Sequence, residues 1–286
     1  MATELEIKLT LSEPAQARAV EWLLAPPEAT KGPRKTLVNR YYDTPDAALN
    51  SARAALRVRQ AGDRFIQTLK TRGEFVDGAH RREEWEWELA GPELDLSLLE
   101  QTPLHGQVDL TALELAFETN FQRQVVMLES GSSVIEVAVD SGEILGGGRS
   151  LPLHEVEFEL KAGEPGELMR WAKALACEVP VFLNLVSKAE QGYFLAGIYR
   201  PEVPVSSEPL SVMELLHTVS ISWLTGEHVK LPPSALSAIT ETASAAGFDK
   251  EWQELNHSLQ SGTTTDDLIR KFPQLGRLQL ALALVG

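Results

Sequence analysis

The stretch TELEIKLTL at residues 3–11 alternates polar and apolar residues without a break. Successive side chains of a β-strand point to opposite faces, so Glu4, Glu6 and Lys8 share one face and the apolar residues between them share the other. The stretch therefore predicts a strand with one charged and one apolar face. The fold depends on which of these faces turns outward.

Basic residues gather on two further strand patterns. In ALRVRQ, Arg57 and Arg59 share one face, and in the following RFIQTLKT, Lys70 shares a face with Thr68. A two-residue turn that contains Gly62 joins the two patterns and predicts a β-hairpin. Three cations are therefore expected on neighbouring strands.

Acidic residues gather on two other strand patterns. In SVIEVAVDSGEIL, Glu136 and Asp140 lie on one face, opposite isoleucine and valine residues. In LPLHEVEFEL, Glu155, Glu157 and Glu159 lie opposite valine, phenylalanine and leucine. Acids and bases are thus separated onto different strands.

Any one of these charged faces fits the solvated outer surface of an antiparallel sheet. Taken together they do not, because exposed ion pairs stabilise a fold by less than about 1 kcal/mol and like charges would lie side by side without benefit. We therefore expect the charged faces to line the inside of a barrel, whose apolar faces are covered by helices. There, carboxylates would suit a hard divalent cation, and Lys and Arg would suit phosphate oxygens.

The motif ELEIK resembles the ExExK signature of the CYTH superfamily, also called triphosphate tunnel metalloenzymes. The similarity continues in order through YYDT, LRVR, TLK, RREE, VDSGE, EVEFEL and SKAEQGY. These motifs span residues 1–200, and their order and spacing are most similar to bacterial inorganic triphosphatases.

This resemblance implies an α+β fold with an eight-stranded antiparallel β-barrel tunnel, flanking helices and a small C-terminal all-helical region. We expect the tunnel domain over residues 1–200, a Pro- and Ser-rich linker over 201–210 and the small helical domain over 211–286. Packing of the last region against the barrel is the favoured interpretation, and a contact with a partner or with a second copy in a homodimer is the alternative.

Helical patterns lie between and after the strands. SEPAQARAVEWLLA from Ser12, DLTALELAF from Asp109 and EPGELMRWAKALACE from Glu164 predict three helices. Cys177, the only cysteine, is expected to be a buried small residue of the third. The chain after the linker is helical in pattern, with Pro273 as an interruption.

The resemblance also implies the site residues. The ligands for Mg²⁺ or Mn²⁺ would be Glu4, Glu6, Asp140, Glu157 and Glu159. The triphosphate would contact Lys8, Arg57, Arg59, Lys70, Arg82, Arg123 and Lys188. Catalysis would depend on Glu4, Glu6, Lys8 and Asp140. Which carboxylate orients the attacking water stays open.

Arg123 has different neighbours from the other predicted cations. It shares its alternating face with Phe121, Val125 and Met127. A bulge or another orientation is therefore an alternative to a regular strand at this position.

The implied function is metal-dependent hydrolysis of inorganic triphosphate to diphosphate and phosphate. Cations and fixed Lys and Arg can stabilise the charge on the transferring phosphoryl group, so no protein nucleophile is required. The alternatives on the same fold are a nucleoside or thiamine triphosphatase and an adenylate cyclase. A further alternative is a noncatalytic module that binds polyphosphate or nucleotide.

Composition limits the partners. The formal net charge of -15 disfavours adhesion to nucleic acid or to an anionic membrane. No leader pattern and no apolar stretch of about 18 residues is found, so we expect a cytoplasmic protein. The expected partner is inorganic triphosphate or another small molecule that carries a triphosphate.

Overall fold

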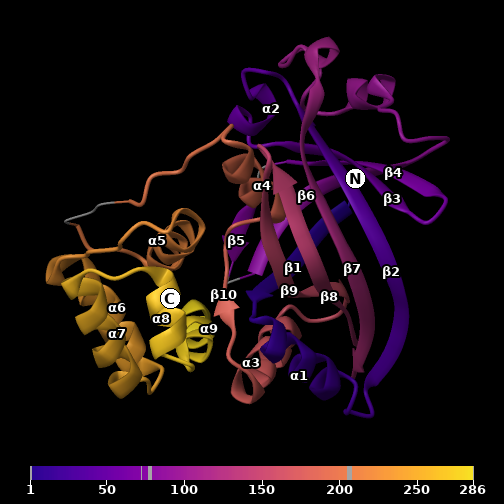
Figure 1. Cartoon of the computed structure of the whole chain (residues 1–286). Coiled ribbons are helices and arrows are strands. Elements are labelled where there is room, and N and C mark those ends of the chain that lie inside the picture. Colours follow the sequence, from indigo (N-terminus) through magenta and orange to yellow (C-terminus); the bar gives the residue numbers. More distant parts are fainter. Residues whose placement is uncertain (1, 72, 77–78, 205–207, 286) are drawn as a thin grey trace.

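The computed structural model describes residues 2–71, 73–76, 79–204 and 208–285 (Figure 1). Within these residues, eight antiparallel strands form a ring in the order β1-β9-β8-β7-β2-β3-β4-β6, and β6 pairs with β1 to close it. The ring strands are β1 (Ala2–Thr10), β2 (Ala29–Asp43), β3 (Ala55–Ala61), β4 (Arg64–Lys70), β6 (Ala79–Leu89), β7 (Glu114–Ser130), β8 (Ser133–Gly146) and β9 (Arg149–Ala162). The predicted eight-stranded antiparallel barrel is confirmed.

Two short strands extend this ring without entering it. β5 (Glu74–Val76) pairs with the start of β6, and β10 (Phe182–Leu183) pairs with the end of β1. β1 therefore carries β9 along one edge, while β6 and β10 divide the other edge between them.

The apolar face of β1 points outward into a helical layer. Ile7 and Leu9 are buried in the largest hydrophobic cluster, together with residues of α1 (Glu13–Leu23) and α3 (Gly166–Glu178). These two helices lie against the outside of β1, β8 and β9 (Figure 1). The charged face is left for the barrel interior, as the alternation predicts.

The helix predicted from Ser12 is confirmed as α1. The Ser12 side chain accepts a hydrogen bond from the Ala15 backbone N–H, which satisfies one of the free donors at the helix start. Ala15, Ala19 and Leu23 form its buried face. α3 likewise confirms the helix predicted from Glu164.

The helix predicted from Asp109 is wrong. Asp109 caps only the single 3₁₀ turn η2 (Leu110–Ala112), and β7 begins at Glu114. The chain is extended there because it pairs with β2, where Glu114 lies opposite Asp43. Long-range strand pairing overrides the local helix propensity of this Leu- and Glu-rich stretch.

Cys177 is exposed, so its predicted burial is also wrong. α3 turns Leu168, Ala172 and Leu175 toward the core, and Cys177 lies on the opposite side of the last turn. An error of one or two residues within a helix changes the exposure completely, because neighbouring helical residues point about 100° apart.

Short segments cover the side of the barrel formed by β3, β4 and β6. Trp85 and Trp87 pack outward against a cluster that contains Leu99 and Leu104. The remaining short elements here are α2 (Ala48–Ser51) and η1 (Leu96–Gln101). The chain enters the barrel again through α4 (Lys188–Ala196).

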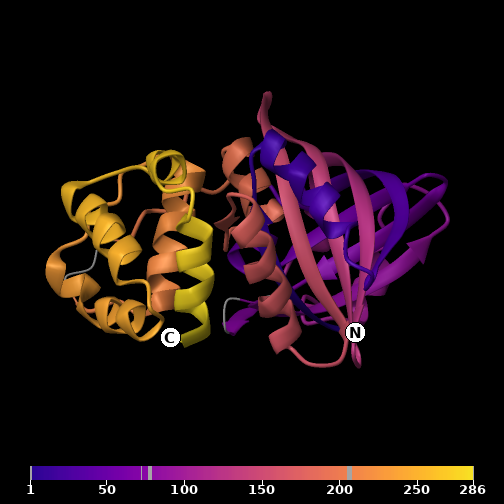
Figure 2. The ribbon, with the colours of Figure 1, turned by 90° about the horizontal axis from the view of Figure 1, so that it is seen from below.

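The C-terminal region is helical, as predicted. Its elements are α5 (Val212–Thr225), η3 (Pro233–Leu236), α6 (Ser237–Ala245), α7 (Asp249–Ser261), α8 (Thr265–Lys271) and α9 (Leu275–Val285). α9 packs on α3 and β10, and Figure 2 shows α3 between the barrel and these helices. The Gln279 side chain on α9 hydrogen-bonds both the N–H and the carbonyl oxygen of Leu183.

The packing of this region against the barrel is therefore confirmed. One hydrophobic cluster contains residues of β1, α3 and α9 and therefore crosses from the barrel to the C-terminal helices. The division into a tunnel domain, a linker at residues 201–210 and a helical domain stays a prediction. No helix in the described ranges has both the length and the apolar content to cross a membrane.

Candidate active site

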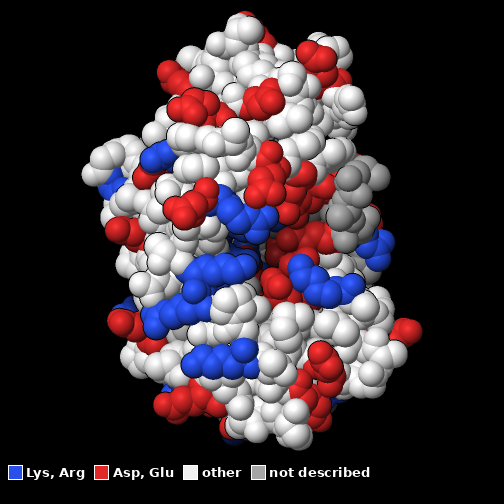
Figure 3. Space-filling model, turned by 90° about the vertical axis from the view of Figure 1, so that its right-hand side faces the viewer, with Lys and Arg blue, Asp and Glu red and all other residues white. Residues whose placement is uncertain are grey.

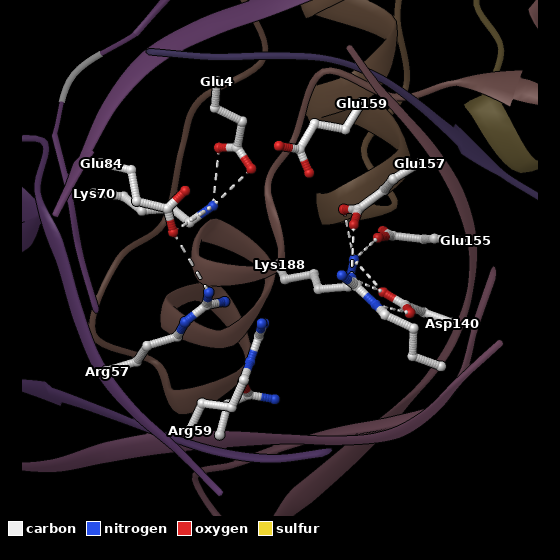
Figure 4. Close-up of polar contacts among 12 residues, drawn as sticks. Glu4, Arg57, Arg59, Lys70, Glu84, Asp140, Glu155, Glu157, Glu159 and Lys188 are labelled. Atoms are coloured by element: carbon white, nitrogen blue, oxygen red, sulfur yellow. Dashed lines mark hydrogen bonds and ion pairs between the residues drawn. The ribbon is translucent and has the colours of Figure 1, made fainter. Parts of the chain in front are cut away.

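The barrel encloses a cavity of about 1040 Å³, and each of the eight ring strands contributes to its lining. Half of the lining residues are Glu, Lys or Arg, and Figure 3 shows a hollow with mainly Lys and Arg on one side and mainly Asp and Glu on the other. Figure 4 shows the labelled side chains projecting into this ring, all from strands except Lys188, which belongs to a helix, α4 (Lys188–Ala196).

Strand pairing brings Arg123 of β7 opposite Asp140 of β8. Arg123 donates from Nε to Oδ1 and from Nη2 to Oδ2 of Asp140, both at 2.7 Å, and Nη2 also lies 2.9 Å from Oε2 of Glu157. Burial alone would lower the pKa of Arg123, but Asp140 and Glu157 raise it. The guanidinium is thus fixed in place and permanently charged.

Lys188 reaches the same acids from α4. It is the first residue of this helix, whose start is fixed by a capping box between Ser187 and Glu190. Its Nζ lies 2.7 Å from Glu155, 2.7 Å from Glu157 and 3.0 Å from Asp140. Burial alone would lower the pKa of Lys188, but these three carboxylates raise it well above its ordinary value.

α4 can approach this closely because of a glycine. A Cβ on Gly192 would lie 2.1 Å from ring atoms of Phe117 on β7, so a larger residue would push the helix out of the barrel. Leu195 of the same helix packs on Phe121, which is why an apolar residue points inward beside Arg123. β7 keeps a continuous register with β8 across Arg123, so the alternative of a bulge in that pairing is wrong.

A second group of ion pairs lies on β1, β3, β4 and β6. Lys70 Nζ lies 2.9 Å from Glu4 and 3.3 Å from Glu84, which is opposite Lys70 in the β4–β6 ladder. Arg57 Nη2 lies 3.7 Å from the same Glu84, and its Nη1 donates to the hydroxyl of Tyr41. Burial alone would raise the pKa of Tyr41, but Arg57 lowers it.

Arg57 and Arg59 keep hydrogen-bonding capacity that the described protein groups do not use. The buried Nε of Arg57 has no hydrogen-bond partner among the described residues. Arg59 donates from Nε to Oδ1 of Asn39 at 2.7 Å, and no carboxylate of the described chain forms an ion pair with it. Burial, together with repulsion from Arg57 and Arg123, lowers the pKa of Arg59 to about 9. Such a site favours an incoming anion.

Lys8 and the acids beside it complete the lining. Lys8 lies opposite Glu157 in the β1–β9 ladder, and its Nζ donates to the carbonyl oxygen of Val186. Glu159 of β9 lies opposite Glu6 in the β1–β9 ladder and opposite Glu136 in the β8–β9 ladder. Strand register alone therefore brings acids together from three neighbouring strands.

These acids have the chemistry of a divalent-cation site. Burial raises the pKa of Glu159, and Glu4 and Glu136 raise it further, while Lys161 acts in the opposite direction. Figure 4 shows the carboxylates of Glu4 and Glu159 turned toward one space. Within the described ranges, no three acidic, His or Cys side chains are already gathered as a metal site. The carboxylate oxygens that repel one another here fit a hard cation.

The structure brings most of the predicted site residues to this one cavity. Those on its lining are Glu4, Glu6, Lys8, Arg57, Arg59, Lys70, Arg123, Glu157, Glu159 and Lys188. Asp140 lies behind the lining with a side chain that is 0% exposed, and its metal and catalytic roles stay predictions. Arg82 lies opposite Glu4 in the β1–β6 ladder, but its side chain is outside the described residues.

Several site residues were not predicted. Glu84 and Glu86 line the cavity, and the strict alternation of RREEWEWEL places them opposite Trp85 and Trp87, so this signal was available in the sequence. Gln16 gave no such signal. Its side chain, on α1, donates to the backbone carbonyl oxygens of Asp140 and Glu155 from outside the barrel.

Comparison with known proteins agrees with this geometry. Residues 2–193 match the CYTH domain, so the chain belongs to the CYTH domain family. It is 34% identical over 207 residues to the inorganic triphosphatase of Haemophilus influenzae, a match that covers 69% of this chain and 56% of that protein. The chain thus spans little more than half the length of this relative.

A solved structure shares the fold. The putative adenylyl cyclase HpAC1 from Hippeastrum, described as having a dominant triphosphatase activity, superposes with a TM-score of 0.50 at 22% identity. The alignment covers 69% of this chain and 98% of HpAC1. At this identity the similarity concerns the fold alone.

Proposed function

We propose that this chain hydrolyses inorganic triphosphate to diphosphate and phosphate with the help of Mg²⁺ or Mn²⁺. The observation that carries the proposal is the position of Arg59, a cation inside the barrel that is repelled by Arg57 and Arg123 and pairs with no carboxylate of the described chain. A polyanion in the cavity would relieve this repulsion. The triphosphatase relative is consistent with that anion.

The cations would bind the phosphate chain from several sides. Arg57 and Arg59 would contact it from β3, Arg123 from β7 and Lys188 from α4. Lys8 and Lys70 would contact it from β1 and β4. Fixed donors of this kind stabilise the charge on the transferring phosphoryl oxygens without having to reorganise.

The carboxylates would serve the cation and the water. Glu4, Glu6, Glu157 and Glu159 would hold Mg²⁺ or Mn²⁺, with Asp140 as the predicted further ligand, and a bound cation would supply charge neutralisation and an acidified water. A carboxylate of this set would orient the attacking water. Lys70 would leave Glu4 and Glu84 as the phosphate chain enters.

The cavity size supports a second candidate substrate. A cavity of about 1040 Å³ lies at the upper end of the range of small-molecule pockets, and it exceeds the needs of a bare triphosphate. Phe75, Tyr199 and His217 also line it, so it has room and aromatic surface for a nucleoside. A nucleoside triphosphatase is therefore the second proposal.

Phosphate and diphosphate release from inorganic triphosphate and from ATP, each with Mg²⁺ or Mn²⁺, tests both proposals. Glu4→Gln should abolish turnover, whereas the matched change Glu88→Gln, at an acid that is 63% exposed on β6, should not. Faster turnover of ATP would favour the second candidate. Tight triphosphate binding without turnover of either substrate would indicate a binding module instead.

A further inference from the structure

Lys161 is the last charged residue of the β9 face that lines the cavity. It lies two residues after Glu159 on the same side of the strand, and its Nζ is 2.6 Å from Oε1 of Glu159. The Lys161 side chain is 39% exposed and that of Glu159 is 25% exposed, so this pair lies where the cavity meets solvent. Sequence patterns did not single out this lysine.

The ammonium of Lys161 lies within the field of several acids. Glu159, Glu136 and Glu4 all raise its pKa, against the effect of burial, and all three line the same cavity. Glu4 in turn forms an ion pair with Lys70. Lys161 thus pairs with one of these acids, Glu159, and Lys70 pairs with another, Glu4.

The two lysines differ in what they could do when a substrate enters. Lys70 lies beside Arg57 and Glu84 on the wall with the phosphate-binding cations, so it can exchange Glu4 for a phosphate oxygen. Lys161 lies at the solvent edge beside Glu159, on β9, which is four strands away from β3 with Arg57 and Arg59 in the ring. When a divalent cation binds Glu159, it would replace the Lys161 ammonium there.

We propose that Lys161 is a positioning residue. Its ammonium group pairs with the Glu159 carboxylate before a divalent metal binds there, and the strength of this pair sets the metal affinity of the site. The inference rests on the proposed function, because it assumes that Glu159 is a ligand. The ammonium group keeps the acids together at low metal concentration. A metal must displace it, which weakens the measured affinity by the strength of the Lys161–Glu159 pair.

Binding of Mn²⁺ without any triphosphate tests this directly, by isothermal titration calorimetry or by the electron paramagnetic resonance signal of free Mn²⁺. Lys161→Met removes the ammonium but keeps most of the length of the side chain, and it should tighten Mn²⁺ binding roughly fivefold, the size expected for one partly exposed ion pair. Lys161→Arg keeps the charge and should stay within about twofold of wild type. Lys250→Met removes an exposed lysine of α7 and is the matched control for net charge.

Thermal unfolding gives a second measurement. Without divalent cation, Lys161→Met should melt below wild type, because the acids lose a counter-charge, and Mn²⁺ should raise its Tm by more than it raises that of wild type. Unchanged or weaker Mn²⁺ binding in Lys161→Met, with wild-type binding intact, would overturn this inference alone. Absence of Mn²⁺ binding in wild type would overturn the metal-dependent function and this inference together.

Discussion

Arg123 and Asp140 form a two-point ion pair inside the barrel, with both N–O distances at 2.7 Å. They face each other across β7 and β8, and the Asp140 side chain is 0% exposed. Because the pair fixes the plane of the guanidinium, Arg123 can also contact Glu157 on the cavity lining. The orientation of a predicted phosphate contact thus depends on an acid that the cavity does not reach.

Asp140→Asn should destabilise the protein strongly. The change leaves Arg123 and Lys188 close together with only Glu157 as a shared counter-charge, and loss of one partner from a buried ion pair costs about 3–5 kcal/mol. Urea denaturation measures the loss. Glu159→Gln is the control, since its pair with Lys161 is partly exposed and should cost less than about 1 kcal/mol. Equal losses in the two variants would contradict the structural role of Asp140.

Mn²⁺ and triphosphate binding to Asp140→Asn test the predicted role of Asp140 as a metal ligand. If Asp140 acts only through Arg123 and Lys188, folded Asp140→Asn keeps the Mn²⁺ affinity of wild type and loses triphosphate affinity. Loss of Mn²⁺ binding would support its assignment as a ligand. The two measurements therefore separate positioning from coordination.

Arg59→Met should leave the free energy of unfolding unchanged or raise it by about 1 kcal/mol, while it weakens triphosphate binding at least tenfold. The first effect follows from the lost repulsion with Arg57 and Arg123 and the lost burial of a charge, which offset the lost hydrogen bond to Asn39, and the second follows from the lost charge-assisted contacts. Arg57→Met is the control, because its guanidinium pairs with Glu84 and its loss should lower stability. A clear loss of stability in Arg59→Met would show that its charge is already satisfied in the free protein.

Triphosphate binding should take up protons at alkaline pH. The pKa of Arg59 in the free protein is lowered to about 9, chiefly by burial, and a bound polyanion would raise it, so affinity should fall as pH rises through about 9. Stability should move the other way, because between about pH 9 and the ordinary pKa of arginine the unfolded chain binds more protons than the folded one. Calorimetric titration near pH 9.5 in two buffers of different ionisation enthalpy measures the uptake. Arg59→Met should show none.

Local alternation predicted which side of each strand is charged, and the energetics of exposed ion pairs predicted that this side turns inward. Both predictions depend on a period of two residues, which the chain carries wherever a strand stays regular. Glu84 and Glu86 follow the same rule and were within reach of the sequence. The sequence therefore contained most of the charged lining.

Partnerships across the barrel could not be predicted in the same way. Lys188 meets Asp140, Glu155 and Glu157 because α4 returns to the barrel, and Gln16 meets the carbonyl oxygens of two strands because α1 packs on their outer side. Such contacts depend on how distant segments pack, which a strand pattern does not encode. The wrong helix at Asp109 has the same origin, since pairing with β2 decided the conformation of Glu114.

Gln279→Leu should weaken the attachment of the C-terminal helices to the barrel. The Gln279 side chain is 2% exposed, accepts from the N–H of Leu183 at 2.9 Å and donates to its carbonyl oxygen at 3.1 Å. A leucine of similar size would leave both backbone groups without these partners, and each buried unsatisfied group costs about 1–3 kcal/mol.

Urea denaturation measures this cost, with Gln253→Leu at an exposed position of α7 as the matched control. β10 also pairs with Leu9 and Thr10 of β1, the strand that carries Glu4, Glu6 and Lys8, so the loss should extend to the barrel and keep the transition cooperative. An early, separate transition in Gln279→Leu would instead mean that the C-terminal helices unfold as their own domain. Equal stability of the two variants would mean that apolar packing between α9, α3 and β10 holds the region without these hydrogen bonds.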